Sequence, residues 1–137
     1  MRLERKVLRV GEYNGIAGEF TSIQEAVNAA KPGDWILIGP GDYKQASTQS
    51  IPTEYGDGVA GADILITTPD LHVRGMNRNT VMIDGTKPGS PECSSAEADQ
   101  VFGPAEGSSW LGNNGVVVYE ANGVHLQNCL LYTSRCV

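Results

Sequence analysis

The chain has 137 residues, of which 40% are hydrophobic and 19% are charged, and its formal net charge is −6. This composition is typical of one globular domain and excludes a disordered chain. The acidic balance, with no run of Lys or Arg beyond the first ten residues, argues against a nucleic-acid or anionic-membrane partner. No apolar stretch follows Met1 that could serve as a signal peptide or span a bilayer.

Residues 1–19 are expected to form a lead-in strand, and residues 20–43 a helix followed by a first strand. Ser22 is suited to cap the helix, and Glu25, three residues on, completes a capping box. Apolar residues then recur at steps of three and four, so one stripe of a helix of about ten residues is buried. The turn at 31–34 ends this helix, and the wholly apolar run Trp35–Ile38 predicts a strand buried on both faces.

Residues 62–128 contain short β-prone segments separated by Gly, Asn, Asp or Pro, which is typical of strands that turn corners in a coil. We expect strands at 63–67, 71–74, 80–84, 116–119 and 124–128. Alternation within them predicts inward pairs that stack as ladders inside a solenoid. These pairs are Leu71 with Val73, Val81 with Ile83, Val116 with Val118, and Val124 with Leu126.

Residues 86–114 are rich in Gly, Ser, Pro and acidic residues and show no period of strand or helix. They are expected to be an inserted loop, and a loop of this length is either functional or disordered.

Residues 129–137 leave the pattern of the preceding strands and resemble translated sequencing adapter. The codons TGT-CTC-TTA-TAC-ACA-TCT-AGA-TGT-GTA-TAA encode them with a stop, and the part from TTA to TAA is its own reverse complement. The alternative is that Leu130, Leu131 and Tyr132 continue the last strand. We expect an artefact here and a frame cut off within a larger fold, which leaves Cys93 as the one native cysteine and no disulfide framework.

Three segments carry a family resemblance. Residues 20–43, FTSIQEAVNAAKPGDWILIGPGDY, resemble the opening of the pectin-lyase-like right-handed parallel β-helix proteins. Residues 71–85, LHVRGMNRNTVMIDG, look like a β-helix coil of that superfamily, and residues 123–128, GVHLQN, are similar to one of its strands. The resemblance implies an all-β fold in which 1–137 is a single partial domain: the first coils of a right-handed parallel β-helix with an N-terminal capping α-helix.

What the resemblance implies about function is broader, because fold alone does not choose among the members. We expect the N-terminal part of a secreted or cell-surface protein that binds or processes polysaccharide, such as a pectin-like uronan lyase or hydrolase. Catalytic residues, and the calcium ligands of the lyases, lie on middle coils in that superfamily, so this fragment is expected to be inactive and without a cofactor. A noncatalytic surface or structural β-helix is the alternative, and a phage or periplasmic accessory protein is a third.

Few residues are candidates for a site. His72 and His125 should point outward and could bind a metal in register, but two exposed histidines on different coils are the simpler interpretation. The acidic residues of the loop lack the spacing of a calcium site, and Asp84 before Gly85 is typical of a turn. Trp110 and Tyr119 are the substrate-binding candidates, because outward aromatic rings can stack on sugars. Catalytic and metal-ligating residues are not assigned. The other residues considered are Tyr43, Tyr55, Glu92, Glu97, Asp99 and Glu106.

The last coil has no neighbour beyond 124–128 if the frame is cut. We therefore expect the fragment to self-associate through its open C-terminal coil.

Overall fold

The computed structural model describes residues 4–44, 49–52, 59–100, 105–106, 109–110 and 113–132. Its regular structure is mostly β-strand, with two helices among the described residues. The chain divides into two compact units, which are described separately. The first unit comprises Met1–Tyr43, Ile66–Met82 and Val118–Leu130, and the second comprises Lys44–Leu65, Ile83–Val117 and Leu131–Val137.

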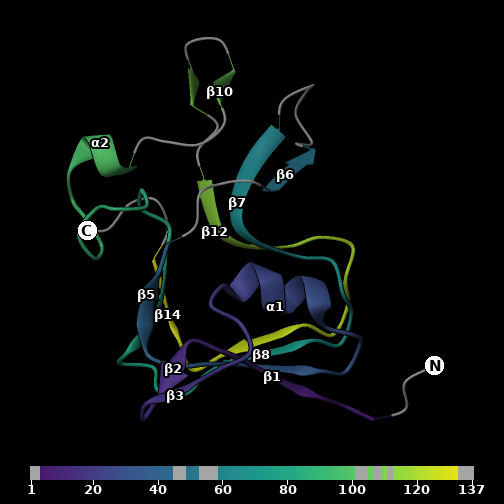
Figure 1. Ribbon diagram of the computed structural model, residues 1–137. Helices are drawn as coiled ribbons and strands as arrows, with labels where there is room; N and C mark the ends of the chain where they lie inside the picture. Colours follow the sequence, from purple (N-terminus) through teal and green to yellow (C-terminus); the bar gives the residue numbers. More distant parts are fainter. Residues whose placement is uncertain are drawn as a thin grey trace. The chain divides into compact units, whose positions relative to one another are not determined.

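A four-stranded parallel sheet is the largest sheet of the first unit (Figure 1). Its strands lie in the order β1 (Val7–Val10), β4 (Trp35–Ile38), β8 (His72–Gly75) and β13 (His125–Gln127). The register aligns Leu8, Ile36, Val73 and Leu126 in one inward row. The predicted burial of both faces of Trp35–Ile38 is wrong: Ile36 and Ile38 are fully buried, but Trp35 and Leu37 are half-buried because they point outward.

Helix α1 (Ile23–Ala29) packs on β1 and β4, as the apolar stripe predicts. The Ser22 side chain accepts a hydrogen bond from the Glu25 backbone N–H at 3.5 Å, which confirms the predicted N-cap. Asp34 holds the turn that follows, because its carboxylate accepts hydrogen bonds from the backbone N–H groups of Lys6 and Lys31, both at 2.9 Å. One buried carboxylate thus joins the start of β1 to the end of the helix.

Residues 1–19 hold more than the predicted lead-in strand. After β1, strands β2 (Glu12–Tyr13) and β3 (Ile16–Ala17) form an antiparallel hairpin. Asn14 and Gly15 connect them with φ of 51° and 77°. An Asn-Gly pair with both φ values positive is the favoured two-residue hairpin turn, so the sequence carried a signal for this element.

Two further sheets have the orders β14-β9-β5 and β12-β7-β6. The first contains β5 (Gly41–Tyr43), β9 (Val81–Asp84) and β14 (Leu130–Tyr132), and the second contains β6 (Gln49–Pro52), β7 (Val59–Ile66) and β12 (Asn113–Val118). β6 and β7 pair antiparallel, so the polar stretch after Lys44 contains a strand that the sequence did not predict.

The predicted inward pairs have mixed outcomes. Leu71, Val73, Val81 and Ile83 are buried, as expected. Leu126 is 36% exposed although it is aligned with buried Val73, because β13 is the last strand in its sheet. The inward position predicted for Val118 is wrong, since it is 47% exposed at the end of β12, the outer strand of its sheet.

The insertion at 86–114 is not the structureless loop that its composition suggests. It contains helix α2 (Glu97–Gln100) and a hairpin of β10 (Ala105–Glu106) and β11 (Ser109–Trp110), and β12 begins at Asn113.

The predicted adapter segment 129–137 is described as far as Tyr132. Its residues Leu130–Tyr132 form a strand of their own, β14, in a sheet with β9 and β5. They therefore do not continue the predicted strand at 124–128, whose counterpart β13 ends at Gln127. Whether residues 129–137 are translated adapter depends on the DNA and not on the structure, so the adapter origin stays a prediction. Cys129 is a free thiol, whereas Cys93 is disulfide-bonded, so the expectation that Cys93 stands alone is wrong.

Candidate functional site

The outward face of the four-stranded sheet carries a row of three rings. Strand register places Trp35, His72 and His125 opposite one another on β4, β8 and β13. The ring centroids of Trp35 and His72 lie 4.3 Å apart with an interplanar angle of 8°. Those of His72 and His125 lie 4.9 Å apart at 5°. The predicted outward direction of both histidines is confirmed, and the structure brings them side by side with a tryptophan.

The stacking decides which parts of the rings remain available. Since the planes are nearly parallel, the face of each ring is turned toward its neighbour, and both faces of His72 are covered. Trp35 and His72 are half-buried and His125 is exposed. The imidazole edges, which carry the nitrogen donors and acceptors, therefore offer more to a ligand than the ring faces do.

A second outward row lies two residues along the same strands, with Arg9, Leu37, Arg74 and Gln127 in register. Arg74 and Gln127 are exposed. Arg9 forms an ion pair with Glu19 at 3.3 Å, with about half of each side chain exposed. The face therefore combines imidazole edges, an exposed guanidinium and an amide, which together can bind hydroxyl and carboxylate oxygens.

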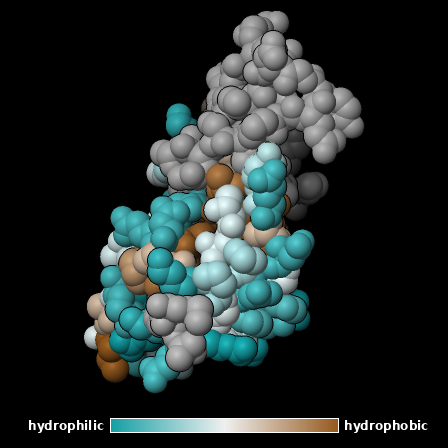
Figure 2. Space-filling view, turned by 90° about the vertical axis from the view of Figure 1, so that its right-hand side faces the viewer, coloured by the Kyte–Doolittle hydropathy of each residue, from teal (hydrophilic) through white to brown (hydrophobic). Residues whose placement is uncertain are grey.

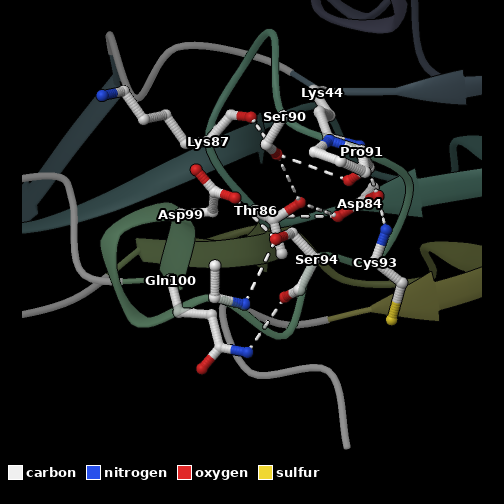
Figure 3. Close-up of polar contacts among 11 residues, drawn as sticks. Lys44, Asp84, Thr86, Lys87, Ser90, Pro91, Cys93, Ser94, Asp99 and Gln100 are labelled. Atoms are coloured by element: carbon white, nitrogen blue, oxygen red, sulfur yellow. Dashed lines mark hydrogen bonds and ion pairs between the residues drawn. The ribbon is translucent and has the colours of Figure 1, made fainter.

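A buried ion pair lies in the second unit (Figure 3). The Lys44 ammonium donates to the Asp84 carboxylate at 2.6 Å, and the two side chains are 7% and 0% exposed. The other hydrogen bonds to this carboxylate come from the Thr86 backbone N–H at 3.0 Å, the Thr86 hydroxyl at 2.6 Å and the Cys93 backbone N–H at 2.8 Å. Asp84, at the end of β9, thus holds the backbone at Thr86 and at Cys93 in the segment that follows.

Burial by itself would raise the pKa of Asp84, but the hydrogen bonds from Lys44, Thr86 and Cys93 outweigh it and hold that pKa well below its usual range. A carboxylate that stays ionised and is sealed from solvent cannot serve as a general acid toward a polymer. The geometry therefore supports the predicted structural role of Asp84 in a turn. The sequence alone did not identify its ion-pair partner, Lys44.

One of the acidic residues considered in the insertion, Asp99, takes part in local structure. The Ser94 hydroxyl donates to the Asp99 carboxylate at 2.6 Å and accepts from the Ala96 N–H at 3.2 Å, next to α2 (Figure 3). Gln100 donates to the Ser94 carbonyl at 3.0 Å. Within the described residues, no group of three or more His, Cys, Asp or Glu is placed to hold a metal.

The two predicted aromatic candidates belong to different units of the chain. Tyr119 belongs to the first unit, where its side chain is 37% exposed and its backbone N–H donates to the Ile66 carbonyl at 2.9 Å. Trp110 belongs to β11 in the second unit, and its side chain lies outside the described residues, as does Tyr55. Tyr43 donates its hydroxyl to the Gly39 carbonyl at 2.7 Å, and its burial raises its pKa. Its ring lies against Gly41, where an added side chain would meet it.

A small pocket of about 80 Å³ lies beside the β2–β3 hairpin, lined by Arg9, Gly11, Tyr13, Ile16, Gly18 and Met76. Tyr13 and Ile16 are 50% and 63% exposed. Such a volume holds a few water molecules rather than a sugar. Figure 2 shows one side of the molecule, where hydrophobic residues form small separate patches among hydrophilic ones.

No family model matches the chain, and neither a curated protein nor a solved structure does. In the part of the chain that the structure describes, no helix is both long and apolar enough to cross a membrane.

Proposed function

We propose that the chain forms the first coils of a right-handed parallel β-helix and that α1 covers its N-terminal end. The order in which the chain visits its sheets supports this. It passes from β4 to β5 and β7 and then from β8 to β9 and β12, so it visits the three sheets twice in the same order, and from β13 to β14 it visits the first two again. α1 packs on β1 and β4, the strands at the beginning of the first sheet. An end cap protects the first coil of a solenoid from pairing and from exposing its core.

We further propose that the outward face of the four-stranded sheet binds an acidic polysaccharide of the uronan type, in a secreted or cell-surface parent protein. The observation that carries this is the alignment of the ring row with the row that contains Arg74 and Gln127. Arg74 supplies a charge-assisted hydrogen bond to a uronate carboxylate. The edges of His72 and His125 and the Gln127 amide supply hydrogen bonds to hydroxyl groups. The proposal concerns binding and assigns no cleavage step to these residues.

Binding of the 137-residue chain to polygalacturonate, compared with a neutral polysaccharide, tests this function. Arg74→Ala should weaken binding about tenfold, since a hydrogen bond to a charged group contributes about 1.5 kcal/mol. Arg78→Ala is the matched control, because Arg78 is exposed in the turn after β8 and its loss changes the net charge equally. Equal weakening by both variants, or equal affinity for the neutral polymer, would show that this face does not recognise uronans.

A noncatalytic structural β-helix is the second candidate, and one observation favours it. Trp35 and His72 turn their faces toward each other at 4.3 Å, so the row also stabilises the stacking of strands. If that is its purpose, Trp35→Ala lowers the free energy of unfolding while polygalacturonate binds neither protein.

A further inference from the structure

The pair His72 and His125 occupies directly opposed positions on adjacent parallel strands. We propose that these two imidazoles form a binding site for a borderline divalent transition metal, of the class of Ni²⁺, Cu²⁺ or Zn²⁺. Neither residue belongs to the buried Asp84 network, and the site does not depend on the polysaccharide proposal. A metal bound here would join β8 to β13, two strands that are far apart in the sequence.

The ligand chemistry is appropriate. Neutral imidazole nitrogen is a good ligand for Zn, Cu and Ni. Both rings point outward, and His125 is exposed, so the remaining coordination positions are open to water.

The separation of the rings is also appropriate. Two nitrogens bound side by side to one metal at about 2.0–2.1 Å lie about 3 Å apart. The ring centroids are now 4.9 Å apart. Neighbouring strands place the two backbones about 4.8 Å apart, so tilting the rings about their side-chain torsions brings their nitrogens together.

Chelation has a consequence for the third ring. Nitrogen lone pairs lie in the ring plane, and parallel rings direct them side by side rather than toward a common point. The rings must therefore leave their parallel arrangement when they bind a metal. His72 is stacked on Trp35 at 4.3 Å, so the fluorescence of Trp35 reports binding.

Arg74 lies two residues from His72 on the same face and repels a cation. Arg74→Ala should therefore tighten metal binding, whereas it weakens uronan binding. These opposite signs separate the two proposals, and either can fail without the other.

The test uses the full chain with Cys129→Ser, since the free Cys129 thiol would also bind such metals. Trp110→Phe is included so that Trp35 is the only tryptophan of the chain. Ni²⁺ is titrated at about pH 7.5, and the thermal midpoint is measured with and without it. The expected result is saturable quenching of Trp35 fluorescence and a metal-dependent rise of the thermal midpoint.

His125→Gln removes one ligand and leaves the Trp35–His72 stack as the reporter. It should raise the Ni²⁺ concentration for half-saturation at least tenfold, whereas Gln127→Ala, on the same strand and face, should not. Melting without metal shows that both variants fold. The proposal is overturned if His125→Gln titrates like its parent, or if no saturation is seen up to about 1 mM Ni²⁺.

Discussion

Lys44 and Asp84 form a buried ion pair at 2.6 Å, across forty residues of sequence and with the carboxylate fully shielded from solvent. Taking two charges out of water is costly, and the hydrogen bonds from Thr86 and Cys93 offset part of that cost. The pair thus connects Lys44, the residue directly after β5, to the end of β9, two residues before the 86–114 insertion begins.

Removing one charge of this pair should be strongly destabilising. Asp84→Asn removes the charge that pairs with the buried Lys44 ammonium, and we expect a loss of about 3 kcal/mol in the free energy of unfolding, measured with urea. Glu92→Gln, an exposed change in the same insertion, should have little effect. Similar losses for both variants would mean that the ion pair is not buried in solution.

The same pair gives the protein a pH dependence with a defined sign. The pKa of Asp84 is lower in the folded chain than in the unfolded chain. Its contribution to stability is therefore complete above the unfolded value of about 3.9 and is lost as the pH falls toward the folded pKa. The double variant Lys44→Met/Asp84→Leu should lose this part of the acid sensitivity. Parallel stability curves for both proteins below about pH 4 would contradict the assignment.

Neighbouring residues of β4 should differ in their importance. Ile36 is fully buried, so Ile36→Ala should cost about 3 kcal/mol. Leu37 is half-buried on the outward face, so Leu37→Ala should cost about 1 kcal/mol. Urea denaturation of the two variants distinguishes them, and equal costs would show that the strand does not present one face to the core.

The helix N-cap should make a smaller contribution. Ser22→Ala removes the acceptor for the Glu25 N–H and should cost about 1 kcal/mol. Ser95→Ala, at an exposed loop position, is the control. An equal thermal shift in both variants would mean that the cap contributes nothing specific.

We also expect the chain to self-associate through β13. Leu126 is 36% exposed in a row whose other members are buried, and β13 ends its sheet. A charge on an edge strand opposes pairing, so Leu126→Lys should reduce a concentration-dependent increase of mass in sedimentation. Ile16→Lys removes a more exposed hydrophobic side chain on the hairpin and should not. Sedimentation of the unmodified chain as a monomer at all concentrations would exclude the association.

Much of this fold could be predicted because its signals are local. The Ser22 cap, the apolar stripe of α1 and the buried alternation of Val81 and Ile83 each depend on residues close in sequence. The signal for the hairpin at Asn14-Gly15 is equally local, because an Asn-Gly pair favours the positive φ values that this turn requires. Predictions of inward-facing residues failed where the exposure of a side chain depends on the place of its strand in the sheet, as for Val118.

The candidate site could be predicted only in part. Alternation placed His72 and His125 on the outward side, but their contact depends on the register between strands separated by a long insertion, which local pattern does not determine. The position of Trp35 beside His72 likewise depends on the register between strands, so local pattern does not predict it. The Lys44–Asp84 pair was missed because no periodicity relates two charges from distant segments.

The polysaccharide face and the metal site both require that His125 lies opposite His72, and disulfide trapping tests this most directly. In a Cys129→Ser background, cysteines replace His72 and His125, or His72 and Gln127. Opposed positions on adjacent parallel strands are about 4.8 Å apart, within disulfide range, whereas a shift of two residues separates them by about 8 Å. Mild oxidation should cross-link the His72/His125 pair and leave the His72/Gln127 pair reduced, as read from the masses of proteolytic peptides. Efficient cross-linking of the second pair, or of neither, would contradict the register on which both proposals rest.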